Sequence, residues 1–261
     1  MSDLASHASF HAAEPQVRRI TIADVTASLA QGWRDFLETP TQLFFLALIY
    51  PVVGLALGYV TAGRDLLTIV WPLVAGFALV GPIAALGIYE MSRRREQGLP
   101  VSVWNGMDVF RSAGLGSIIG VGLVLLLLLA AWLLAAEWIF RSTIGADHPA
   151  SLGDLWRVAT GTPEGYRLIL IGNVVGFVFA VAALAVSVVS LPLLLERDVG
   201  TVAAIRTSIR AVATNPVPMA VWGLIVAGLL VLGSLPVLVG LAIVIPVLGH
   251  STWHLYRRTL G

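Results

Sequence analysis

The chain has no cysteine and no lysine, and it carries few charged residues of any kind. Without cysteine it can form no disulfide, no thiolate metal site and no cysteine nucleophile. Only 12% of its 261 residues are charged, against about 25% in a typical soluble domain. Hydrophobic residues make up 57%, and the mean hydropathy is +0.89. Most of the chain is therefore expected to face lipid, and a net charge of +1 gives no reason to expect a nucleic-acid partner.

The first 40 residues contain no apolar stretch of the length that a cleaved signal peptide needs. We expect a flexible tail over residues 1–16 and a single transmembrane domain over residues 17–261, whose first apolar run acts as an uncleaved anchor. All 16 basic residues are arginine. Together with the many Ala, Gly, Val and Leu residues, this usage is typical of a GC-rich bacterial genome.

Six apolar runs have about the 20 residues that a helix needs to cross a bilayer. They are Gln42–Val60, Leu66–Tyr89, Leu115–Phe140, Leu168–Leu195, Val217–Gly233 and Leu235–Tyr256. The last two come from one continuous stretch that is too long for a single crossing, and a turn signal at Gly233-Ser234-Leu235-Pro236 divides it. The prediction is an all-α bundle of about six transmembrane helices arranged as three hairpins. The alternative for the last pair is one kinked helix.

Arginine placement favours this topology. With the N-terminus in the cytoplasm, only Arg64, Arg141, Arg157 and Arg167 lie outside, and the other twelve arginines lie inside. The positive-inside rule therefore predicts a multi-pass protein of the bacterial inner membrane with both termini in the cytoplasm. A single kinked helix would move Arg257 and Arg258 outside and weaken the bias.

A charged segment precedes each pair of runs, so the chain reads as three similar units. These segments are Asp24–Glu38, Val101–Arg111 and Thr201–Ala213, and their helical periodicity predicts amphipathic helices on the cytoplasmic surface. Each unit also has a proline in its second run, namely Pro82, Pro192 and Pro246, where we expect a kink. A further short helix is predicted outside, from Ser151 to Thr160.

Four longer motifs resemble one known family. They are Gly76–Pro82 with Gly87–Glu96, Ser190–Gly200, Ala211–Trp222 and Gly249–Arg258. These segments resemble the bacterial integral membrane proteins catalogued as domain of unknown function 2189, over a stretch from about Val17 to the end of the sequence. The resemblance implies a multi-span inner-membrane protein of proteobacteria, and it implies no established activity.

The polar residues that could carry a function gather at the predicted cytoplasmic end. Glu90, Glu196 and His254 could form a ring that binds a cation or relays protons, or these groups could simply form ion pairs with arginines at the interface. The candidate cluster comprises Glu90, Arg93, Arg94, Glu196, Arg197, His254 and Arg257.

Three other polar positions have simpler alternatives. His250 and His254 share a helix face and are weak candidates for a metal or haem site, since no third ligand is near in sequence. Glu137 is placed to pair with Arg141 four residues later, with a proton relay as the alternative. Asn173 lies within a span, where an interhelical hydrogen bond is the expected role and a ligand contact the alternative.

No catalytic constellation and no cofactor motif is recognisable in the sequence. We therefore expect no enzyme and no cofactor, but a structural or accessory membrane protein, associated with a membrane complex. Its expected partners are the bilayer, anionic lipid headgroups, and another membrane protein or a second copy. The alternatives are a transporter or channel for small solutes or ions, and a haem- or metal-dependent redox protein.

Overall fold

The structure is a computed structural model that describes residues 15–39, 85–145, 152–236 and 239–260. Within these ranges the chain forms helices and turns, with no strand. The span predicted at Gln42–Val60 lies outside the described residues, as does most of the span predicted at Leu66–Tyr89. Pro82 lies outside them too.

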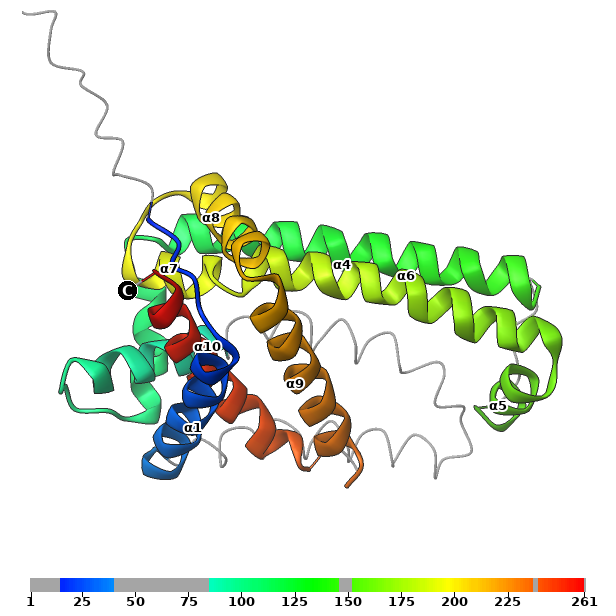
Figure 1. The fold of residues 1–261 in the computed structure, drawn as a ribbon, viewed down its shortest axis with the longest axis horizontal. Helices are drawn as coiled ribbons and strands as arrows, with labels where there is room; N and C mark the ends of the chain where they lie inside the picture. Colours follow the sequence, from blue (N-terminus) through cyan, green and yellow to red (C-terminus); the bar gives the residue numbers. More distant parts are fainter. Residues whose placement is uncertain (1–14, 40–84, 146–151, 237–238, 261) are drawn as a thin grey trace, which may run out of the picture.

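The longest feature is a pair of antiparallel helices, α4 (Leu115–Thr143) and α6 (Pro163–Ser187), which lie side by side (Figure 1). The short helix α5 (Leu152–Gly161) connects them and confirms the helix predicted at Ser151–Thr160. Helix α6 begins sharply because Pro163 occupies its first turn and the Thr162 hydroxyl accepts a hydrogen bond from Gly165 N–H at 3.0 Å.

The predicted run Leu168–Leu195 is divided into two helices. Helix α6 ends at Ser187, and α7 (Ser190–Glu196) begins after a turn at residues 188–189. Pro192 explains the position of this break, because a proline has no N–H and its ring crowds the carbonyl four residues earlier, which is that of Val188. Pro246, by contrast, lies inside a helix that continues through it.

The last apolar stretch forms two helices, α9 (Pro216–Ser234) and α10 (Leu241–Leu260), which contact each other. The stretch is therefore divided into two helices, as predicted, and is not one kinked helix. Helix α8 (Thr201–Thr214) precedes α9 and coincides with the third charged segment.

The first two charged segments are also helical. Helix α1 (Ile22–Glu38) begins with a capping box between Thr21 and Asp24. Residues 85–96 form a helical segment, and the following segment η1 (Val103–Arg111) is a 3₁₀ helix capped by Ser102. The tighter winding of η1 differs from the 3.6-residue periodicity that we expected there. Its Gly106 backbone lies so close to Gly87 that a β-carbon on either glycine would come within 3.3 Å of the other residue's Cα.

Each charged segment packs against the final helix of the unit before it, and the first segment packs against the last unit. Thus η1 contacts residues 85–96, α8 contacts α7, and α1 lies along α10. Arg94 and Arg258 both stand twelve residues after a proline, at positions 82 and 246. Each reaches a carboxylate on the segment packed against it, Arg94 to Asp108 at 3.2 Å and Arg258 to Asp24 at 3.3 Å. The three units therefore close into a ring.

Three stretches of the described chain are long and apolar enough to cross a membrane: α4, the run Pro163–Glu196, and α9. These agree with the third, fourth and fifth predicted spans. The sixth prediction, Leu235–Tyr256, coincides with most of α10. The second half of α10 carries two histidines and two arginines, so its crossing of the membrane stays a prediction. The total of six transmembrane helices stays a prediction as well.

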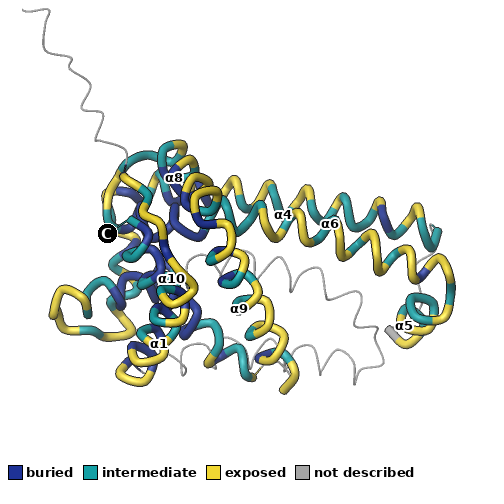
Figure 2. The backbone as a smooth tube through the Cα atoms, viewed as in Figure 1, coloured by how far each residue is buried: buried dark blue, intermediate teal, exposed yellow. Residues whose placement is uncertain are grey.

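Burial is concentrated at one end of the molecule, where α1, α7, α8 and α10 meet (Figure 2). Large apolar side chains on α4 and α6 are exposed instead, including Leu127, Leu134, Trp138 and Phe177. Exposed leucine and aromatic residues along helices of spanning length are expected where lipid replaces water as the solvent. The buried end is where the polar residues collect.

Candidate functional site

Asp35 of α1 is the centre of a buried hydrogen-bonded cluster. Its Oδ2 accepts hydrogen bonds from Nε2 of His254 at 2.8 Å and from the hydroxyl of Ser92 at 2.9 Å. Three helical segments meet at this one carboxylate, because Ser92 belongs to residues 85–96 and His254 to α10. Burial alone would raise the pKa of Asp35, but the hydrogen bond and charge of His254 outweigh it, so the pKa lies below its ordinary value.

His250 completes the cluster one helical turn before His254. Its Nδ1 lies 2.6 Å from the Ser92 hydroxyl, whose single hydrogen is already donated to Asp35. Nδ1 must therefore carry a hydrogen and donate it to Ser92. The Nε2 atom is buried without a partner. A protonated Nε2 would leave a buried donor unsatisfied, so the geometry assigns the neutral form of His250 with its hydrogen on Nδ1.

Arg95 connects this cluster to the end of α1. Its Nε lies 3.6 Å from Oδ1 of Asp35, and its terminal nitrogens donate to Glu38 and to the hydroxyl of Thr39. The positive charge beside Asp35 disfavours a second cation there. Within the described ranges, no group of three His, Asp or Glu residues is placed to hold a metal ion.

A second group of charges lies around Glu90 and Glu196. Glu90 is only 3% exposed and accepts two hydrogen bonds from Arg93, at 2.7 and 2.8 Å. This bidentate pairing raises the pKa of Arg93, and the negative charge of Glu196 adds to the effect. Arg94 approaches the same carboxylate at 3.9 Å. Glu90 is therefore neutralised by residues of its own helix.

Glu196, at the end of α7, is held by α10. It accepts hydrogen bonds from the Tyr256 hydroxyl and from Arg257, the latter at 3.0 Å. Arg257 also donates to Glu96 at 2.9 Å, and the indole of Trp253 donates to the same carboxylate at 3.1 Å. The ends of three helical segments are thereby joined through one arginine.

Together these residues form what we call the polar layer, a set of side chains from α1, residues 85–96, α7 and α10 that contact one another at one end of the bundle. Its members are Asp35, Glu90, Ser92, Arg93, Arg94, Arg95, Glu96, Glu196, His250, Trp253, His254, Tyr256 and Arg257.

The structure brings most of the predicted cluster into this layer. Glu90 and Glu196 both act on Arg93, whereas His254 lies with Asp35. Arg197 is half-exposed and approaches Glu196 at 3.9 Å. Asp35 was not predicted as a site residue, although its place one helical turn after Gly32 could have marked it as inward-facing.

Asn215 was also missed as a site residue, although it lies in one of the four motifs. Its side chain is buried between α8 and α9, where its oxygen accepts from Ile20 N–H at 2.8 Å. Its amide nitrogen donates to the Arg18 carbonyl at 3.0 Å. Arg18 N–H in turn donates to the carbonyl of Thr259 at 2.8 Å. The Asn215 amide therefore holds the segment before α1 at the junction of α8 and α9, and the Arg18 N–H holds it at the end of α10.

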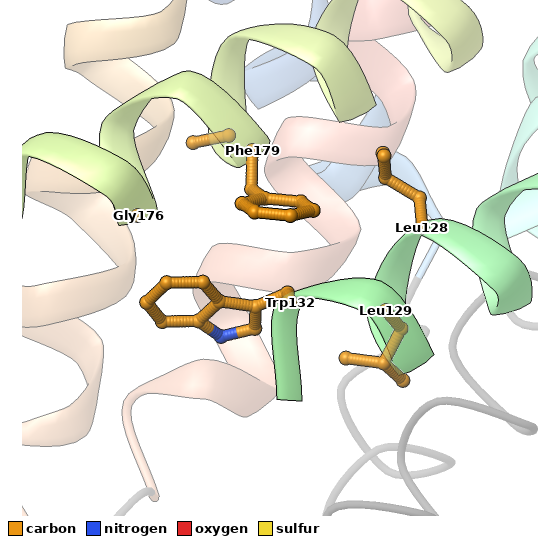
Figure 3. Close-up of a pocket in the computed structure, with 6 residues that line it drawn as sticks. Leu128, Leu129, Trp132, Gly176 and Phe179 are labelled. Carbon is orange, nitrogen blue, oxygen red and sulfur yellow. The ribbon is translucent and has the colours of Figure 1, made fainter. Parts of the chain in front are cut away.

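Two apolar cavities of about 310 and 320 Å³ lie between α4 and α6. Figure 3 shows the first, with the Trp132 ring facing Phe179 beside Gly176; the ring centroids are 5.6 Å apart. The second is lined partly by Asn173, whose amide donates to the Ile169 carbonyl of its own helix at 2.7 Å. Near the far end of α4, Glu137 and Arg141 form the expected pair at 2.6 Å.

The long apolar helices and the buried polar layer at their end define an integral membrane protein of the helical type. Residues 70–196 match the model of the family described as "Predicted integral membrane protein (DUF2189)". The match agrees with the family resemblance over this stretch, whereas the motifs Ala211–Trp222 and Gly249–Arg258 lie outside it. No curated protein and no solved structure matches the chain.

Proposed function

We propose that the chain is a non-catalytic accessory protein of a bacterial inner membrane, with both termini in the cytoplasm and the polar layer at the cytoplasmic side. The observation that carries this proposal is the mutual pairing of the layer: Asp35, Glu90, Glu96 and Glu196 each contact a cationic or hydrogen-bonding side chain of the layer. A set of charges that satisfy one another stabilises one arrangement of helices and leaves little to bind or transform a substrate.

The surface of this end offers a place for a partner protein. Trp104 and Met107 of η1 are 83% and 59% exposed, next to the exposed Phe110. The chain after residue 96 (teal in Figure 1) projects at the end opposite α5, away from the long helices. Exposed aromatic and methionine side chains are typical of protein interfaces.

The test is purification of the tagged full-length chain in particles that keep its native lipids. We expect a membrane protein to co-purify at a fixed ratio and to be lost from the double variant Trp104→Ser/Met107→Ser. The matched control is Trp138→Ser, which changes an exposed tryptophan on α4. A monomer without a partner, or equal behaviour of both variants, would refute the proposal.

A second candidate function is ion or solute transport, with Asp35, His250 and His254 as the titratable groups. It is favoured by the burial of this cluster close to the ends of the spanning helices. Reconstituted protein should then carry a flux that Asp35→Asn abolishes. An optical spectrum and a metal measurement of the purified protein test the redox alternative, which depends on His250 and His254.

A further inference from the structure

Helix α1 exposes large apolar residues on its outer side, although its inner side already buries Val25 and Phe36. Ser28 and Asp35 are buried against the rest of the protein, whereas Ile22, Trp33 and Leu37 are 47%, 46% and 63% exposed. An amphipathic helix on a water-facing surface places its apolar residues inward and exposes few large ones. The outward face of α1 is therefore poorly suited to water.

The exposed residues of α1 form one continuous face with an apolar part and a charged part. On a helix with 3.6 residues per turn, Ile22, Trp33 and Leu37 lie within about 60° of one another. Arg34 and Glu38 follow on the next sector, and the buried residues lie on the opposite side of the helix. Helix α1 thus has one side for protein, one for an apolar medium and one for water.

The neighbours of α1 identify the apolar medium. Helix α1 packs along α10 and also contacts α9, one of the three stretches able to span a membrane. Leu224 and Val231 on α9 are exposed as well. Lipid that surrounds α9 would reach the apolar sector of α1, and a tryptophan beside an arginine is typical of the membrane interface.

We propose that α1 lies in the membrane interface, with Ile22, Trp33 and Leu37 in the acyl region and Arg34 at the headgroups. The helix then fixes the depth of the polar layer, because Asp35 on its inner side binds His254 and Ser92. This inference depends on the membrane class of the protein and not on the accessory role.

The test uses the absence of native cysteine. Single variants Trp33→Cys, Leu37→Cys and Arg34→Cys are labelled with an environment-sensitive fluorophore and reconstituted in phosphatidylethanolamine/phosphatidylglycerol vesicles. Labels at 33 and 37 should emit at shorter wavelength and be quenched by lipids with brominated acyl chains. The label at 34 should be quenched by aqueous iodide instead. Thermal melting of each labelled variant checks that it is folded.

Iodide quenching at all three positions would overturn the proposal, since it would place the whole outer face of α1 in water. The same is true if 33 and 37 are aqueous in vesicles but protected in native membranes, which would show that a partner protein covers this face. Purified vesicles contain no partner, so loss of the accessory role would leave this result unchanged.

Discussion

Nε2 of His254 lies 2.8 Å from Oδ2 of Asp35, although the two residues are 219 positions apart in the sequence. The contact joins the first described helix to the last. It closes the ring of three units, since η1 and α8 each pack on the unit directly before them, while α1 packs on the last. The contacts of Asp35 and of the glycine one turn before it should therefore dominate the stability of this end.

Replacement of Asp35 by alanine should destabilise the protein strongly. The change leaves His254, Ser92 and Arg95 without their shared acceptor in a buried place. Removal of one partner from a buried pair costs about 3–5 kcal/mol. The exposed pair of Glu137 and Arg141 provides the control, and Glu137→Gln should cost less than about 1 kcal/mol. Thermal unfolding in detergent measures both, and equal effects would contradict the central role of Asp35.

The pH dependence of stability should change in the variant Asp35→Asn. Because the folded pKa of Asp35 is lowered, its charged form contributes stability fully above the ordinary carboxyl pKa of about 4. That contribution is lost as the pH falls through the lower folded value. Melting temperature measured from pH 7 to pH 3 should therefore fall less steeply below pH 4 in Asp35→Asn than in the unchanged protein. Parallel curves would assign the acid sensitivity to other groups.

The crossing of α1 and α10 depends on Gly32. A β-carbon at this position would lie 2.0 Å from Oγ of Ser251 and 2.4 Å from its backbone nitrogen. Gly32→Ala should therefore force the helices apart and destabilise the fold by about 3 kcal/mol. Gly228→Ala on α9 meets no atom within 4 Å, so it should be neutral or slightly stabilising in the same melting assay. Tolerance of Gly32→Ala would disprove the close crossing.

Asn215→Ala should release the segment before α1. The change leaves the Ile20 N–H and the Arg18 carbonyl without their side-chain partner. The loss costs about 1–3 kcal/mol at the buried Ile20 N–H and less at the part-buried carbonyl. Limited digestion with trypsin should then cut after Arg18 or Arg19 sooner than in the unchanged protein, and mass spectrometry locates the cut. Asn173→Ala, on the exposed face of α6, should digest at the unchanged rate.

Arginine placement and the hairpin together predict the orientation. Arg157 lies in α5, on the predicted outside, and Gln97 follows the helical segment 85–96 on the predicted inside. A membrane-impermeant maleimide should label Arg157→Cys in intact spheroplasts and Gln97→Cys only after permeabilisation. Both side chains are exposed, so failure to label reports on the side of the membrane. The reverse pattern would invert the topology.

Local signals predicted much of this architecture. The length of the apolar runs predicted α4 and α9, and the turn signal at Gly233–Pro236 separated α9 from α10. The spacing of polar residues predicted α5 and α8. The break between α6 and α7 at residues 188–189 was not predicted. We expected a kink at Pro192 itself, whereas a proline disrupts the helical turn that precedes it. The 3₁₀ form of η1 accompanies its close contact with Gly87, which no local pattern could reveal.

The members of the polar layer were predicted more readily than their partners. Glu90, Glu196 and His254 were grouped because they follow the spans, but the sequence could not show that His254 pairs with Asp35. That pairing depends on how α1 packs on α10, which is decided by the long-range fit of Gly32 to Ser251. The periodicity of a helix shows which of its faces is buried, but it does not show which distant helix covers that face.

The attachment of the first segment to the last helix has a consequence for biosynthesis. The ribosome completes α1 long before it makes α10. The contacts of Asp35 with His254 and of Arg18 with Thr259 can therefore form only after α10 has been synthesised. Until then the inner face of α1 lacks the helix on which it packs in the finished protein. A chain interrupted before α10 would therefore leave Asp35 without His254 and the inner face of α1 without its main neighbour.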